Sequence, residues 1–188
     1  MTDSFDELAA RATTDPAAAS LLLARFGREA SVVSAHIGGW AELAGSRGPA
    51  FALGFARQVW ERLQAALTPD CAVADQGDDL LGVFDSRDKA VLAALDGHSH
   101  LTALFGSPVV SLAVGAGLVL EAPDGRLYGA EVARVRTLSA VWGGTGVAVT
   151  EAAHAGLTPP HGVGSHRAPH ALEALVGTRF HILQDHRE

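Results

Sequence analysis

The sequence has one cysteine, Cys71, one lysine, Lys89, and no asparagine. A single cysteine excludes an internal disulfide framework and is typical of a reducing compartment. The longest apolar stretch, residues 108–120, is shorter than the ~18 residues that a membrane-spanning helix needs. The N-terminal residues are acidic and do not resemble a secretory signal. We therefore expect a cytoplasmic protein without a membrane span.

The chain also lacks an excess of positive charge, since its formal net charge is −7. An acidic chain gains nothing from the counterion release that drives binding to phosphate backbones, so we expect no nucleic-acid partner. With 188 residues, of which 48% are hydrophobic, the chain can bury a core without disulfides or metal. This length suits one α/β domain with a short extension.

The first 30 residues are predicted to form a helical extension, followed by a main domain over residues 31–185. Ser4 is a candidate N-cap for a helix that runs to about Ala12. Asp15 and Pro16 supply an N-cap and a first-turn proline for a second helix that ends near Phe26. These helices could pack onto the main domain or onto a second subunit.

The main domain shows alternating strand and helix patterns. Their order is β-α-β-β-α-β with further elements behind it, which predicts an α/β (α+β) fold with a ferredoxin-like core and a mostly antiparallel sheet with flanking helices. The predicted strands are residues 31–37, 71–74, 80–84, 109–120, 147–150 and 179–183; the predicted helices are residues 49–67, 86–104 and 130–141, and residues 159–169 are expected to form a loop.

Four segments carry a family resemblance through their order and spacing. Residues 35–40 read Ala-His-Ile-Gly-Gly-Trp, Gly77-Asp78 precedes Phe84, residues 114–117 read Val-Gly-Ala-Gly, and residues 128–132 read Tyr-Gly-Ala-Glu-Val before Leu138. Together they resemble the catalytic domain of class III adenylyl and guanylyl cyclases. The resemblance covers about residues 31–183 and implies the fold predicted above.

The resemblance also implies an active site between two domains of a dimer. There, two aspartates hold two divalent ions, and the opposing domain supplies a Lys, an Asp, an Asn and an Arg. This chain departs from that pattern at most positions. Asp78 is retained, but the other positions hold His36 for the first metal ligand, Ala74 for Lys, Arg126 for the purine-reading Asp, Ala133 for Asn and Thr137 for Arg, with Arg134 and Arg136 offset nearby.

The candidate metal ligands are therefore Asp78 and His36. Imidazole suits Zn²⁺ or Mn²⁺ better than Mg²⁺, which prefers hard oxygen ligands. Asp78 could instead be an ordinary turn residue, and His36 a structural histidine. A His36–Asp78 hydrogen bond that replaces the metal is the third possibility.

The candidate ligand-binding residues are the turn after the first strand and the two offset arginines. A turn lined by backbone amides before a helix can bind an anion. Trp40 is expected to belong to the core. The residues are Gly38, Gly39, Trp40, Arg134 and Arg136.

These departures favour a non-catalytic cyclase-like domain that acts in signalling or regulation through dimerisation or ligand binding. Losing a single transition-state donor typically costs about 10²–10³ in rate. The alternative is a divergent cyclase that uses His36, Asp78 and an offset arginine with Mn²⁺ or Mg²⁺. A third possibility is a regulatory subunit of another cyclase or signalling protein. We expect a homodimer, and no cofactor unless the alternative holds.

Overall fold

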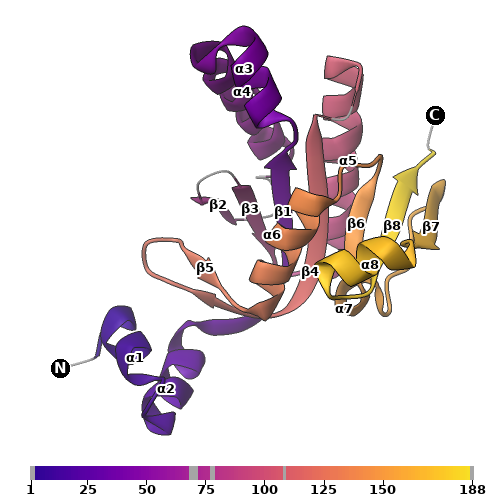
Figure 1. The fold of residues 1–188 in the computed structure, drawn as a ribbon. Helices are drawn as coiled ribbons and strands as arrows, with labels where there is room; N and C mark the ends of the chain where they lie inside the picture. Colours follow the sequence, from indigo (N-terminus) through magenta and orange to yellow (C-terminus); the bar gives the residue numbers. More distant parts are fainter. Residues whose placement is uncertain (1–2, 68–71, 77–78, 108, 187–188) are drawn as a thin grey trace.

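A computed structural model describes residues 3–67, 72–76, 79–107 and 109–186 (Figure 1). The predicted elements of the main domain are present, and most begin and end within a few residues of the predicted bounds. The elements are α1 (Phe5–Arg11), α2 (Pro16–Phe26), β1 (Gly27–Ile37), α3 (Trp40–Arg47), α4 (Pro49–Leu67), β2 (Ala72–Gln76), β3 (Asp79–Phe84), α5 (Arg87–Phe105), β4 (Val110–Glu121), β5 (Leu127–Tyr128), α6 (Ala130–Val141), β6 (Val147–Thr150), α7 (Glu151–His154), β7 (Val163–Arg167), α8 (His170–Val176) and β8 (Phe180–Asp185).

The two N-terminal helices begin where the sequence indicated. The Ser4 hydroxyl and the Glu7 carboxylate form a reciprocal capping box at α1. Asp15 caps α2, with Pro16 in its first turn. Helix was predicted as far as residue 30, which is wrong for residues 27–30. Those residues belong to β1 because they pair with residues 117–120 of the long strand β4.

The strands form one sheet in the order β2-β3-β1-β4-β6-β8-β7, with β5 paired to β4 alone. The first four strands of this order pair antiparallel, as in a ferredoxin-like core. The pair β4–β6 is parallel, and β8 joins β6 and β7 antiparallel. The predicted mostly antiparallel sheet with flanking helices is confirmed.

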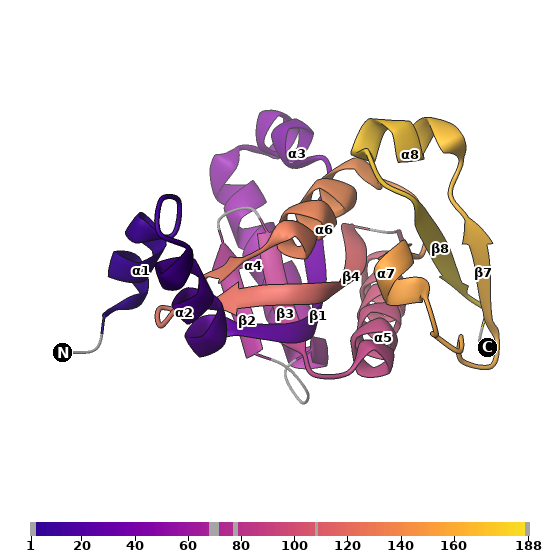
Figure 2. The same ribbon diagram turned by 90° about the horizontal axis from the view of Figure 1, so that it is seen from below.

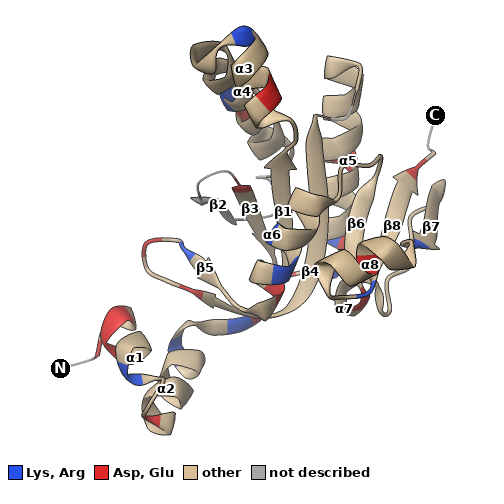
Figure 3. Cartoon of the chain, in the orientation of Figure 1, with Lys and Arg blue, Asp and Glu red and all other residues tan. Residues whose placement is uncertain are grey.

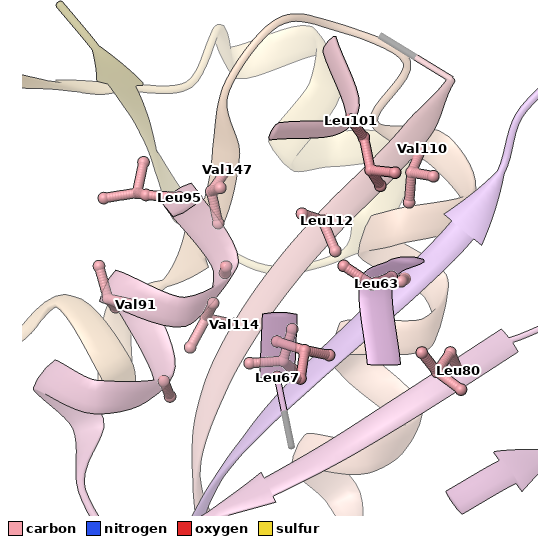
Figure 4. Close-up of a cluster of buried hydrophobic side chains, with 14 of the residues drawn as sticks. Leu63, Leu67, Leu80, Val91, Leu95, Leu101, Val110, Leu112, Val114 and Val147 are labelled. Atoms are coloured by element: carbon pink, nitrogen blue, oxygen red, sulfur yellow. The ribbon is translucent and has the colours of Figure 1, made fainter. Parts of the chain in front are cut away.

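The two faces of the sheet carry separate hydrophobic layers. Side chains of α4 and α5 pack on one face, where Leu63, Leu95 and Leu112 are fully buried (Figure 4). Helix α6 packs on the other face through Val135 and Leu138. Figure 2 shows α5 and α6 on opposite sides of the sheet. A third, small cluster holds α1 and α2 against the far end of β4.

Several elements were not predicted, among them the short strand β5, the edge strand β7 and the helices α3 and α8. Residues 159–169 were expected to form a loop, but residues 163–167 form the strand β7, which pairs with β8. Its sequence, Val-Gly-Ser-His-Arg, has no apolar alternation because β7 is an exposed edge strand. Helix α3 buries no residue, and the described residues of α8 bury only Glu173. Neither helix therefore presents an apolar stripe that could be recognised.

Charged residues are spread over many elements. Figure 3 shows arginines on α1, β1 and α6 and next to β5, with acidic residues close to several of them. None of the helices in the described ranges combines the length and the apolar character needed to cross a lipid bilayer.

Candidate functional site

His36 lies near the end of β1, on the sheet face that α6 covers. Alternation along the strand places His36 on the same face as Ser34, whose hydroxyl is 2.9 Å from that of Ser139 on α6. In the sheet register, His36 stands between Asp79 on β3 and Ser111 on β4. The strand pairing therefore brings an imidazole next to a carboxylate across two neighbouring strands.

The Asp79 carboxylate has a partner on each oxygen. Nδ1 of His36 lies 3.3 Å from Oδ1. Nε of Arg136, on α6, donates to Oδ2 at 2.8 Å. The Asp79 side chain is 10% exposed, compared with 41% for Arg136. The largely buried carboxylate is thus neutralised by a cation from the same chain, as buried carboxylates generally require.

The sequence-based site held Asp78 rather than Asp79. Asp78 lies outside the described residues, and so does its predicted contact with His36. The carboxylate that contacts His36 is Asp79, the next residue. Asp78 and Asp79 are adjacent in the sequence, and the sequence alone does not indicate which of them contacts His36. The pairing register of β1 with β3 decides this.

The two offset arginines point to different partners. Arg134 forms an ion pair with Glu131, one turn earlier in α6. Glu131 is buried, and its Oε2 accepts a hydrogen bond from Thr150 at 3.3 Å. Successive helical residues are rotated by about 100°, so residues two apart leave the helix on opposite sides. Only Arg136 therefore joins His36 and Asp79.

Helix α6 approaches β4 closely because β4 carries glycine at two positions. A Cβ atom on Gly115 would lie 2.6 Å from Val135 and 2.8 Å from Glu131. A Cβ atom on Gly117 would lie 2.9 Å from Glu131. The Gly-Ala-Gly segment that contributed to the family resemblance thus allows α6 to pack closely against the sheet. This close packing brings Arg136 within hydrogen-bonding distance of Asp79.

The described residues at this site do not fit a two-metal centre. Magnesium prefers several oxygen ligands in octahedral geometry, whereas Asp79 is already paired with a guanidinium. In the described part of the chain, no three His, Cys, Asp or Glu side chains are grouped as metal ligands would be. We therefore derive no chemical step through a metal ion.

The turn after β1 leads into α3. Gly39 has φ of 70° and precedes the first helical residue, a left-handed conformation that favours glycine. Trp40 is 40% exposed, so its expected place in the core is wrong. The side chain instead borders a pocket of about 590 Å³ between the strand ends and α4. Trp40 is exposed because α3 leans on α4 and not on the sheet.

The remaining positions singled out by the resemblance have local roles. The Thr137 hydroxyl donates to the carbonyl of Ala133 within α6. Arg126 pairs with Asp124 in an exposed turn, where the amide and guanidinium of Arg126 hold the pKa of Asp124 below its ordinary value. Ala74 lies in β2 opposite Leu81. The polar side chains at these positions, Thr137 and Arg126, are thus engaged by neighbouring residues of their own segments.

No protein-family model matches the sequence, and no curated protein matches it either. Solved structures of nucleotide cyclases do match its fold. A bacterial light-regulated adenylyl cyclase gives a TM-score of 0.68 at 14% identity, covering 88% of this chain and 55% of that one. The catalytic core of a rhodopsin-guanylyl cyclase with converted specificity, in complex with ATPαS, gives 0.68 at 13% identity, covering 86% and 99%.

A dimeric guanylyl cyclase domain from Blastocladiella emersonii gives a TM-score of 0.66 at 12% identity, covering 87% of this chain and 99% of that one. The chain thus spans about half the length of the light-regulated cyclase and nearly all of the isolated catalytic domains. It has the class III cyclase fold, as the resemblance implied, at 12–14% sequence identity to these structures.

Proposed function

We propose that this chain is a non-catalytic module of the class III cyclase fold that acts through dimerisation or ligand binding. The observation that carries the proposal is the contact between Arg136 and Asp79. A guanidinium from the same chain occupies the carboxylate that faces His36, at 2.8 Å. A divalent cation would have to displace this cation and leave the guanidinium without its partner.

The substitutions at the other positions support the same conclusion. In active relatives, as the resemblance implies, Asn and Arg side chains stabilise the transition state. Here Ala133 has no polar group, and the Thr137 hydroxyl is bonded to its own helix. Neither offset arginine is free to replace them, because Arg134 pairs with Glu131 and Arg136 with Asp79.

Pairing with a second copy of the chain is part of the proposal. The guanylyl cyclase domain of the RhoGC fusion protein from Blastocladiella emersonii, which shares this fold, is known both as a monomer and as a non-canonical dimer. Closed two-fold pairs are the commonest oligomers of soluble proteins. A signalling partner with a similar fold, such as another cyclase, is the other candidate. Sedimentation velocity over a range of concentrations distinguishes a self-associating chain from a monomer that awaits a partner.

The decisive experiment is a turnover assay. The purified chain is incubated with ATP or GTP, with Mn²⁺ or Mg²⁺, and the products are analysed by mass spectrometry. We expect no cyclic nucleotide above the level of the Asp79→Ala and Asp78→Ala variants. A cyclic product that both substitutions abolish would establish a divergent cyclase and overturn the proposal. Expression in a host without its own cyclase removes the background.

A further inference from the structure

We propose that the pocket between α3, α4 and the ends of β1 and β3 binds a small, planar, largely apolar aromatic molecule. This inference deepens the proposed function and rests on its ligand-binding part. The pocket has a volume of about 590 Å³, which is within the range of small-molecule sites. We call it the indole pocket, after the two tryptophans, Trp40 and Trp60, that line it with Ile37, Leu53, Ala56 and Leu80.

The floor of the indole pocket belongs to the hydrophobic core. Ile37 is 5% exposed and Leu80 is 1% exposed, and both pack in the layer beneath α4 and α5. A floor of this kind keeps its shape when the pocket is empty. Helix α3, in contrast, buries no residue, so the wall that carries Trp40 can adjust to the ligand.

Two indole side chains supply the aromatic surface. Trp40 is 40% exposed, and Trp60 is partly buried against the core. Within the described ranges, the ring contacts engage Trp142 with Phe180 but neither of these two indoles. Neither indole is therefore stacked on another aromatic ring in these ranges, and pairing with a ligand ring would stabilise a complex beyond the area that it buries. This favours a flat aromatic ligand over an aliphatic one.

Two uncharged polar side chains, Gln64 and His36, are among the lining residues of the indole pocket. The Gln64 side chain lines the pocket and forms no hydrogen bond with any described residue. His36 uses Nδ1 toward Asp79, and its Nε2 has no partner in the described part of the chain. Both side chains are partly exposed, so each offers a hydrogen-bonding group to a ligand in the pocket.

The charge of the lining excludes a nucleoside triphosphate. Arg57 is the one arginine or lysine among the lining residues, and it pairs with Glu61 at 3.4 Å on the exposed rim. This pair has no net charge, whereas a triphosphate needs several cations or metal ions. The ligand should therefore be neutral or carry a single charge.

His36 connects the indole pocket to the opposite face of the sheet. It lines the pocket and contacts Asp79, which holds Arg136 of α6. A ligand that bonds to His36 therefore acts on a carboxylate that anchors α6. This connection gives a binding event in the pocket a route to the helix on the other face.

The test uses 8-anilinonaphthalene-1-sulfonate, an aromatic probe with a single charge, and the full chain. We expect saturable binding of one molecule per chain by calorimetry, with quenching of tryptophan fluorescence. Trp60→Ala and Leu53→Glu should each weaken binding about tenfold or more. Trp60→Phe keeps an aromatic face and should retain most of the affinity. Circular dichroism verifies that every variant is folded.

Two controls separate the pocket from non-specific adsorption. Leu175→Glu places the same charge on α8, where Leu175 is 67% exposed, compared with 66% for Leu53; binding should be unchanged. Trp142→Phe should also leave it unchanged. Affinity that is equal in Leu53→Glu and Leu175→Glu, or no binding at all, overturns the inference. A cyclic product in the turnover assay would refute the proposed lack of catalysis, but it would not change the outcome of the binding test.

Discussion

Arg136 on α6 holds Asp79 on β3 through a 2.8 Å hydrogen bond, although the two residues are 57 positions apart. The bond joins the helix that covers one face of the sheet to a strand near its edge. It also decides what the carboxylate can do, because a side chain engaged by a guanidinium is a poor metal ligand. The proposed lack of catalysis depends on this contact.

The contact should make a measurable contribution to stability. In a double-mutant cycle of Arg136→Met and Asp79→Asn, we expect a coupling free energy of about 1–3 kcal/mol from urea denaturation, because Asp79 is largely buried. The matched control pair is Arg126 and Asp124, whose side chains are 57% and 51% exposed. It should couple by only about 0.5 kcal/mol. Equal couplings would show that the Asp79 contact has no special role.

The close packing of α6 on β4 should be disrupted by one added methyl group. Gly115→Ala places a Cβ atom 2.6 Å from Val135, so we expect a loss of about 1–3 kcal/mol in the free energy of unfolding. The control is Gly54→Ala in α4, where a Cβ atom meets nothing within 4 Å. It should stabilise the chain by about 0.5–1 kcal/mol through helix propensity. Changes of the same sign in both variants would contradict the predicted close contact.

Acidification should weaken the fold through His98. Burial lowers the pKa of His98 below its ordinary value of 6.5, and its Nε2 accepts a hydrogen bond from the amide of Gly146. As the pH falls below about 6.5, His98 is protonated in the unfolded state before it is protonated in the folded state. The stability that His98 contributes is therefore present above that pH and is lost below it.

The measurement is the free energy of unfolding between about pH 7.5 and 5. His98→Gln should reduce the slope in this window, because glutamine does not titrate. His100→Gln, at an exposed position of the same helix, should keep the wild-type slope. A slope that is unchanged in His98→Gln would assign the pH dependence to other groups.

The N-terminal helices should detach when their small core is weakened. Leu8 is fully buried in the cluster that α1 and α2 form with the end of β4. Leu8→Ala should cost about 2–5 kcal/mol and increase hydrogen exchange in α1 and α2 while the main sheet stays protected. Leu23→Ala, at a position that is 43% exposed, should change exchange very little. Equal exchange in both variants would show that the cluster does not hold these helices.

Much of the fold followed from local patterns. Ser4 and Asp15 cap the helices that they were expected to cap, because capping is a short-range hydrogen bond. Buried strands such as β4 and β6 were recognised by their apolar residues. The edge strand β7 was missed because pairing, not apolar character, holds an exposed strand in place.

In the candidate site, too, some features followed from the sequence and others only from the tertiary structure. The resemblance singled out Gly38, Gly39 and the two offset arginines as candidates, and it predicted a contact of His36 with Asp78, which lies outside the described residues. The choice of Asp79 came from the strand register, and the choice of Arg136 came from its position around α6. The indole pocket had no sequence signal, since Trp40 was expected to be buried and is 40% exposed.

The sequence by itself determined the order of the core elements, the caps of α1 and α2 and the set of chemical groups available, because these depend on neighbouring residues and on composition. Only the tertiary structure decided which groups meet. Asp79 faces both His36 and Arg136 because two strands pair in one register and two glycines let α6 approach the sheet. Such contacts join residues far apart in the chain, and their geometry is a property of the packed fold.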